Sequence, residues 1–288
     1  MNELKGLGVA MVTPFKQNKE IDFVALEKLT SKLIDGGLDY LVVMGTTGES
    51  ATLSKEEKQA VLNAVLKTNN GRLPIVFGIG GNDTIKMVNE YKSFDLSGVS
   101  AILSASPYYN KPSQEGIFQH YKYLSENMSH PIILYNVPGR TASNMTAETT
   151  LRIANEFQNV IGIKEASGNM EQVMQILNNK PSDFLMISGD DALTLPMIAC
   201  GAEGLISVIA NSHPETTKQL VSKGMEGDFE SARLAHYKLL GLIDAIFADG
   251  NPGGVKVLLN EQGVMENEVR LPLVPVNRTV ESILRKLN

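Results

Sequence analysis

The sequence is poor in the residues that bind metals or form disulfides. Its 288 residues include one cysteine and four histidines, and no tryptophan. A single cysteine excludes an intrachain disulfide, which fits a reducing compartment, so we expect a cytoplasmic protein. Because Cys200 ends the apolar run Met197-Ile198-Ala199-Cys200, we expect a buried thiol there and no nucleophile. The histidines lack the spacing of zinc ligands, so the sequence predicts no metal site.

Charge and hydropathy argue against two further classes of protein. The net charge is −6, whereas nucleic-acid binding requires a basic surface. No window approaches the roughly 20 apolar residues that cross a bilayer, and residues 1–6 lack the apolar core of a signal peptide. We therefore expect small-molecule ligands, and neither nucleic acid nor membrane as a partner.

Eight short apolar runs alternate with longer amphipathic segments. The runs are rich in Val, Ile and Leu and do not alternate with polar residues, which is typical of parallel strands covered on both faces. They cover residues 7–13, 40–45, 75–80, 101–106, 132–136, 161–164, 185–189 and 204–209. The amphipathic segments begin near Asp22, Ser54, Asn82, Glu115, Thr146, Asn169, Asp191 and His213. Ser54 with Glu57 predicts a capping box, and Asn82, Thr146 and Asp191 are suitable N-caps.

Eight strands, each followed by a helix, predict an α/β protein with a (β/α)8 TIM barrel over residues 1–226. An open doubly wound sheet is the alternative, but it usually has fewer strands and a glycine-rich turn after the first. Here the first strand leads into Thr13-Pro14-Phe15. Residues 227–288 predict a small α-helical C-terminal region, with helices over 230–247, 254–262 and 276–287.

The active site of such a barrel lies at the carboxyl ends of its strands. Lys164 closes the sixth strand, where its stem must be buried. Desolvation disfavours the ammonium form and frees the amine to attack a carbonyl. The alternative is a structural ion pair, for example with Glu165. Tyr135 ends the neighbouring fifth strand and can exchange protons near Lys164, although a core tyrosine would give the same pattern.

Other polar residues at the strand ends have the chemistry to hold carboxylates. Thr46 and Thr47 lie between two glycines, where backbone N–H groups can bind an anion, although an ordinary tight turn fits as well. Arg140 follows a Pro-Gly turn and suits a bidentate carboxylate, unless it forms a surface ion pair. Gly189 would leave room for substrate. We assign the Asp190-Asp191 pair to capping the seventh helix.

Together these motifs resemble the pyruvate-dependent aldolases of the dihydrodipicolinate synthase and N-acetylneuraminate lyase family. The resemblance runs from Val12-Thr13-Pro14-Phe15 to Leu271-Pro272-Leu273. The Gly-x-x-Gly-Glu loop, the strand-five tyrosine and the strand-six lysine are common to the family. The segments 135–141, 108–112 and 164–169 are similar to the synthase branch, in which the arginine receives the carboxylate of aspartate semialdehyde.

The resemblance implies a mechanism without a metal or an organic cofactor. Lys164 condenses with pyruvate, whose carboxylate lies at Thr47 and near Ile206. The resulting enamine attacks aspartate semialdehyde, which Arg140 holds. Tyr135, Thr46 and Tyr109 form the proton relay. In the family the tyrosine that matches Tyr109 enters a neighbouring subunit's site, so a homotetramer or homodimer is implied.

Two other functions are compatible with the same motifs. A sister aldolase would act on N-acetylneuraminate, a 2-keto-3-deoxy sugar acid or 4-hydroxy-2-oxoglutarate, and Arg140 with the double threonine argues against it. A barrel that binds without turnover would be expected to lack part of the set formed by Lys164, Tyr135, Thr46 and Tyr109, all of which are present.

Free lysine is expected to inhibit weakly or not at all. Lysine-inhibited members of the family have an acidic residue and histidines at an effector site, where this sequence has Lys86, Lys55 and Lys58, although Asn82 and Tyr108 remain. Ammonium groups repel the ligand's ammonium group. An inhibition curve for free lysine tests this, and complete inhibition at sub-millimolar lysine would contradict it.

Overall fold

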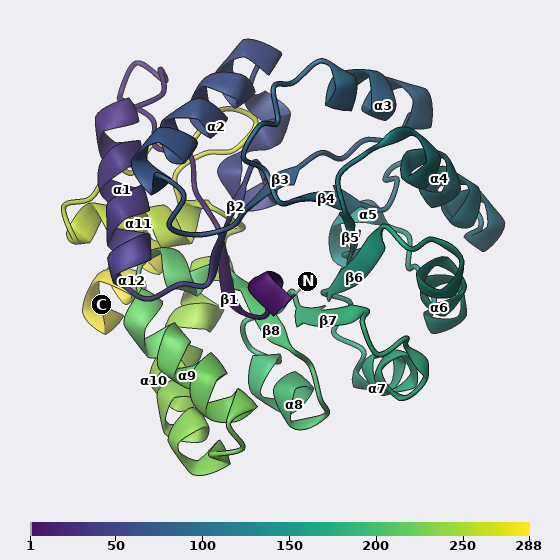
Figure 1. Cartoon of the computed structure of the whole chain (residues 1–288). Coiled ribbons are helices and arrows are strands. Elements are labelled where there is room, and N and C mark those ends of the chain that lie inside the picture. The colour runs from purple at the N-terminus through teal and green to yellow at the C-terminus, as the bar shows by residue number, and fades with distance from the viewer. Residues whose placement is uncertain (1) are drawn as a thin grey trace.

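The computed structural model describes residues 2–288. Its eight strands form one closed parallel barrel in chain order, at the centre of the view in Figure 1. The strands are β1 (Gly6–Ala10), β2 (Tyr40–Val43), β3 (Ile75–Gly78), β4 (Ala101–Ala105), β5 (Ile132–Asn136), β6 (Val160–Glu165), β7 (Leu185–Ser188) and β8 (Gly204–Ser207). Gly8 of β1 lies opposite Tyr40 of β2 on one side and Ile206 of β8 on the other, which closes the sheet. The predicted TIM barrel is confirmed.

Helices surround the strands as an outer ring (Figure 1). They are α1 (Phe23–Asp35), α2 (Lys55–Asn69), α3 (Thr84–Lys92), α4 (Gln114–Asn127), α6 (Ala147–Glu156), α7 (Met170–Asn179), α8 (Thr194–Ala199) and α9 (Pro214–Met225). A further short helix, α5 (Pro138–Thr141), follows β5. Short 3-10 turns are η1 (Asn2–Leu4), η2 (Thr46–Gly48), η3 (Ser50–Thr52) and η4 (Ile209–Asn211).

Local capping explains where several helices begin. The predicted capping box is present, because Ser54 accepts the N–H of Glu57 and the Glu57 carboxylate accepts the N–H of Ser54. Thr146 caps α6 as predicted. The prediction for Asn82 is wrong by one residue, since the side chain of Asp83 caps α3. The prediction for Asp191 is also wrong: α8 begins later, and the carboxylate is buried against β8.

Side chains fill two concentric layers. The inner layer contains residues from alternate positions of the strands, including Val42, Ile133 and Ile187, and the outer layer lies between strands and helices. Gly8 creates the space for Tyr40 inside the barrel, because a Cβ at Gly8 would lie 2.2 Å from the Tyr40 ring. Because Gly8 of β1 has no side chain, the Tyr40 ring of the neighbouring strand β2 fits inside the barrel.

Three helices follow the barrel and lie beside α1 and α9 in Figure 1. They are α10 (Phe229–Phe247), α11 (Gly253–Glu261) and α12 (Arg278–Leu287). The α9 and α10 helices meet at Gly227, whose φ of +84° suits a residue without a side chain. The division of the chain at residues 226 and 227 remains a prediction. Within residues 2–288, no helix is both long and apolar enough to cross a membrane.

The environment of Cys200 differs from the prediction. This residue follows the last turn of α8 and is exposed, although the run before it is apolar. Met197 and Ile198 are buried in that run, and Cys200 is the cap residue beyond them. The prediction of a buried thiol is wrong because α8 ends at Ala199 and the chain turns away from the core at Cys200.

Candidate active site

Lys164 and Tyr135 lie side by side at the carboxyl ends of β6 and β5. They are direct partners in the register of the two strands. Lys164 is only 5% exposed and Tyr135 is 7% exposed. The Lys164 Nζ atom lies 4.3 Å from the centroid of the Tyr135 ring. Two predicted site residues are therefore brought together inside the barrel, with the amine in a largely desolvated position.

Glu165 points away from Lys164, because successive residues of a strand face opposite sides. Its buried carboxylate accepts hydrogen bonds from Asn136 Nδ2 (3.0 Å), Gln172 Nε2 (3.1 Å) and the Ser167 N–H (2.7 Å). The alternative of a Lys164–Glu165 ion pair is therefore wrong for the part of the chain that the structure describes. The amide network instead ties β5 to β6 directly behind the lysine and the tyrosine.

Two adjoining cavities open above this pair. The larger has a volume of about 580 Å³ and the smaller about 360 Å³. Both are lined by Lys164, Tyr135, Thr46 and Arg140. Arg140 lies on α5, is exposed to solvent and lines both cavities. This arrangement places a buried amine and an arginine at the same two cavities.

The loop after β2 supplies the two threonines. Thr46 is exposed and Thr47 is buried, and both belong to the 3-10 turn η2. The Thr47 hydroxyl accepts a hydrogen bond of 3.0 Å from Asn251 Nδ2, and Asn251 itself lines both cavities. Sequence reasoning missed Asn251, which lies beyond the predicted barrel region where no strand end is expected.

A buried ion pair lies beneath this loop. Lys256 of α11 donates to Glu49 across 2.6 Å, and both side chains are fully buried. Burial lowers the pKa of Lys256 to about 8, while Glu49 acts in the opposite direction. Removing one partner of such a pair costs about 3–5 kcal/mol, because the other charge is left buried and unpaired. One available signal was the lone lysine within the apolar run Val255-Lys256-Val257-Leu258-Leu259.

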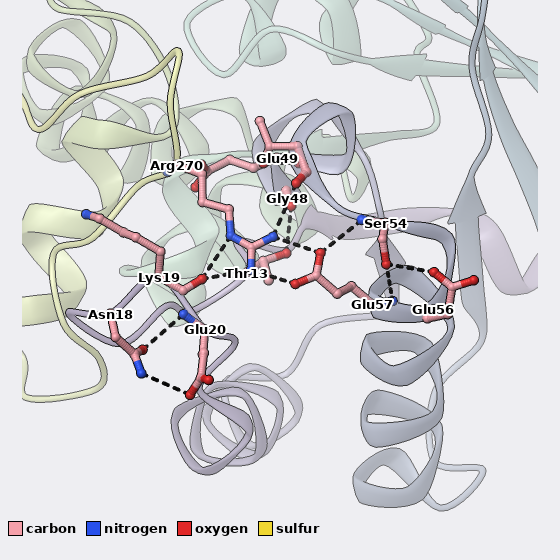
Figure 2. Close-up of polar contacts among 11 residues, drawn as sticks. Thr13, Asn18, Lys19, Glu20, Gly48, Glu49, Ser54, Glu56, Glu57 and Arg270 are labelled. Carbon is pink, nitrogen blue, oxygen red and sulfur yellow. Dashed lines mark hydrogen bonds and ion pairs between the residues drawn. The ribbon is translucent and has the colours of Figure 1, made fainter.

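Arg270 holds the same loop from the outside. Figure 2 shows its guanidinium between the Lys19 carbonyl and the Glu57 carboxylate. It donates to both oxygens of Glu57, at 2.6 and 2.8 Å, and its backbone N–H donates to Glu49 at 2.9 Å. Hydrogen bonds from Arg270 hold the pKa of Glu57 below its usual value. The start of α2 and the end of η2 are thereby fixed to one residue near the C-terminus.

Gly189 gives space to the lysine more directly than to a ligand. A Cβ at this position would lie 3.0 Å from both Cγ and Cε of Lys164 and 2.8 Å from the Ala166 Cβ. Gly189 also lines the smaller cavity. The absence of a side chain at Gly189 leaves space for the Lys164 stem. The expectation that it also leaves room for substrate stays a prediction.

Two predicted site residues lie apart from the cavities. Ile206 is 1% exposed and packs in the inner layer of the barrel. Tyr109 is 87% exposed with φ 71°, whereas its neighbour Tyr108 lines the larger cavity. Among residues 2–288, neither Ile206 nor Tyr109 contributes to the lining of either cavity. Their roles stay predictions, and within one chain Tyr109 does not line the cavities that Tyr135 and Thr46 line.

Two of the lysines predicted to repel a lysine effector, Lys58 and Lys86, lie near acidic side chains. Lys58 and Glu90 both line the far part of the larger cavity, and Lys58 Nζ lies 2.8 Å from the Glu90 carboxylate. The Lys86 side chain is 85% exposed and lies 3.7 Å from Asp83. Both ammonium groups therefore have acidic neighbours, so repulsion of a bound lysine is weaker than the bare sequence suggests. The expectation of weak inhibition stays untested.

Asp191 fixes the end of β8 beside the smaller cavity. Its carboxylate accepts the Ser207 hydroxyl at 2.6 Å and the Val208 N–H at 2.9 Å. Burial raises the pKa of this carboxyl group. Asp190 instead accepts the N–H groups of Ala192 and Leu193. Asp190 therefore stabilises the turn before α8, and Asp191 stabilises the end of β8.

A strand-six lysine beside a strand-five tyrosine, in a cavity at the carboxyl ends of a TIM barrel, defines the class of Schiff-base barrel enzymes. Residues 3–287 match the Dihydrodipicolinate synthetase family. The chain belongs to this family.

Known relatives cover almost the full chain. It is 54% identical over 284 residues to a 4-hydroxy-tetrahydrodipicolinate synthase of Flavobacterium psychrophilum, a match that covers 99% of this chain and 97% of the relative. It is 50% identical to that of Parabacteroides distasonis, with the same coverage. The solved structure of dihydrodipicolinate synthase from Thermotoga maritima has a TM-score of 0.96 at 40% identity, covering 98% and 97% of the two chains.

Substitution of Gly189 should lower the reactivity of Lys164 toward an α-keto acid without unfolding the barrel. In Gly189→Ala the new Cβ meets the Lys164 stem, so we expect at least a tenfold loss of borohydride-trapped adduct on Lys164 with an α-keto acid. The measurement is peptide mass spectrometry. Gly241→Ala is the control, because a Cβ at Gly241 would lie 3.9 Å from Leu287 Cδ1, an ordinary van der Waals distance. Equal adduct yields in both variants would contradict the assignment.

Proposed function

We propose that this protein is a class I aldolase that condenses pyruvate with L-aspartate 4-semialdehyde to 4-hydroxy-tetrahydrodipicolinate, in the diaminopimelate and lysine pathway. The observation that carries the proposal is the largely desolvated Lys164 amine, 4.3 Å from the Tyr135 ring centroid, in a cavity shared with Arg140. The names of relatives up to 54% identical over nearly the whole chain support the same reaction.

The first step is an imine between Lys164 and pyruvate. The neutral amine adds to the keto carbon, and the carbinolamine then loses water, so one C–N double bond replaces one C–O double bond. Proton transfer to the departing hydroxyl requires an acid near the amine, and Tyr135 is the neighbouring group that can give and take a proton. Loss of a methyl proton then gives the enamine that attacks the aldehyde.

The proposal assigns the two substrate carboxylates to different residues of the site. Thr47 of the η2 turn is assigned to the pyruvate carboxylate, and its hydroxyl is already held by Asn251 Nδ2. Thr46 of the same turn is assigned to the proton relay with Tyr135 and Tyr109. Arg140 is assigned to the carboxylate of the semialdehyde, because a planar guanidinium binds a carboxylate through two parallel hydrogen bonds. The pyruvate carboxylate would lie near Ile206, and Gly189 leaves space for the Lys164 stem.

A homo-oligomer completes the site in this proposal. Tyr109 is 87% exposed beside the cavity-lining Tyr108, so it is free to enter the site of a second copy and to join the proton relay there. We include a homodimer or a homotetramer in the proposal for that reason. The single cysteine is compatible with a cytoplasmic enzyme.

The central prediction concerns the imine. Borohydride reduction in the presence of pyruvate should add one reduced pyruvate to the wild-type protein, because reduction turns the imine into a stable amine. The adduct should map to Lys164 and be absent from Lys164→Ala. Lys223→Met removes a surface lysine that pairs with Glu226 and is the control that keeps the nucleophile. A folded wild-type protein that gives no adduct in excess pyruvate would contradict the proposed chemistry.

The second substrate is tested at Arg140. In Arg140→Met we expect the KM for aspartate semialdehyde to rise about 10- to 100-fold, since hydrogen bonds to charged groups contribute about 1.5–3 kcal/mol. Pyruvate trapping on Lys164 should change little. Arg152→Met removes a surface arginine that pairs with Glu115 and serves as the control. An unchanged KM in Arg140→Met would favour a sister aldolase with another aldehyde.

A further inference from the structure

The loop with the two threonines is anchored by a segment far away in the sequence. Glu49 ends the η2 turn in a left-handed conformation, with φ 55° and ψ 33°, and its N–H donates to the Thr46 carbonyl. A residue with a side chain adopts this conformation at a cost, so surrounding contacts must hold it there. The contacts of the Glu49 carboxylate are therefore contacts that fix the shape of the threonine turn.

Both oxygens of that carboxylate are bound by the C-terminal part of the chain. Lys256 Nζ donates to one oxygen at 2.6 Å, and the Arg270 N–H donates to the other at 2.9 Å. Lys256 Nζ also donates to the Glu268 carbonyl at 2.7 Å. The ammonium group lies 4.4 Å from the centroid of the Phe15 ring, which covers it from the barrel side. The pair is thus completely enclosed.

The C-terminal part of the chain also contacts Thr47 at the smaller cavity. Its hydroxyl oxygen accepts from Asn251 Nδ2, so the hydroxyl hydrogen remains available to donate in another direction. Asn251 lies five residues before Lys256, on the turn that leads into α11. A shift of α11 would move the ion pair at Glu49 and the donor to Thr47 together.

We propose that Glu49 and Lys256 are positioning residues that set the affinity for the α-keto acid. Their buried ion pair holds the η2 turn so that Thr46 and Thr47 face Lys164. Neither residue contacts the substrate; both act through the turn. This inference rests on the proposed function, because it assumes that Thr47 on the η2 turn receives the carboxylate of the keto acid.

The test is the dependence of Lys164 trapping on pyruvate concentration. In Lys256→Met and Glu49→Gln, half-maximal trapping should require at least tenfold more pyruvate, while saturating pyruvate still gives the Lys164 adduct. The KM for aspartate semialdehyde should change less than twofold, because Arg140 lies on α5. The double variant should need no more pyruvate than the worse single variant, since the two residues act as one unit.

Matched controls separate positioning from general stability. Lys218→Met breaks a different lysine–carboxylate pair, at 2.7 Å to Asp39, which is partly exposed and lies near the amino end of β1. It should lower the thermal midpoint without changing the pyruvate dependence. Glu49→Asp keeps both charges and shortens the side chain, so it provides a folded variant if the others do not fold, with an intermediate rise in the pyruvate requirement.

The outcomes separate the two proposals. If the wild type traps pyruvate and all Glu49 and Lys256 variants trap it at the same concentration, the positioning role is wrong and the proposed function stands. If the wild type traps no pyruvate, the proposed function fails first. A rise shared equally by Lys218→Met would show a stability effect and overturn the positioning role.

Discussion

Closure of the sheet between β1 and β8 is the constraint on which the other features depend. Because all strands run parallel, closure brings eight carboxyl ends to one rim, and residues that are far apart in the chain meet there. Register then decides which side chains are neighbours: Tyr135 lies opposite Lys164, and Asn136 lies opposite Glu165. One pair faces the cavity and the other forms the amide network behind it. Because successive residues of a strand face opposite sides of the sheet, the same register places Tyr135 and Lys164 at the cavity and Asn136 and Glu165 behind them.

Two buried lysines in this chain illustrate opposite uses of desolvation. Lys256 is enclosed with a carboxylate, so its charge is compensated and serves to hold a loop. Lys164 is enclosed beside an aromatic ring and below a cavity, with its nearest acidic neighbour in sequence turned to the other face of the strand. The same type of side chain is therefore a structural ion-pair partner in one place and, in the proposed function, the nucleophile in the other.

The sequence predicted the barrel because strand and helix periodicity are local properties, and it located Lys164 and Tyr135 because strand ends are local too. Ser54 was predictable as a cap for the same reason. The remaining features depend on distant contacts. Asp191 turns to β8 because Ser207 and Val208 offer donors there, and Cys200 is exposed because α8 stops before it. Lys256, Asn251 and Arg270 meet the Gly45–Glu49 loop only through the folded C-terminal segment, which no periodicity reveals.

The bond between Glu49 and Lys256 joins residues 207 positions apart. During synthesis on the ribosome, the threonine turn emerges long before its anchor. A nascent chain that has completed all eight strands still lacks α11, so its turn has no partner for the Glu49 carboxylate. The threonine turn thus gains its anchor only after residue 256 has been synthesised, and fragments that end before that residue lack the anchor altogether.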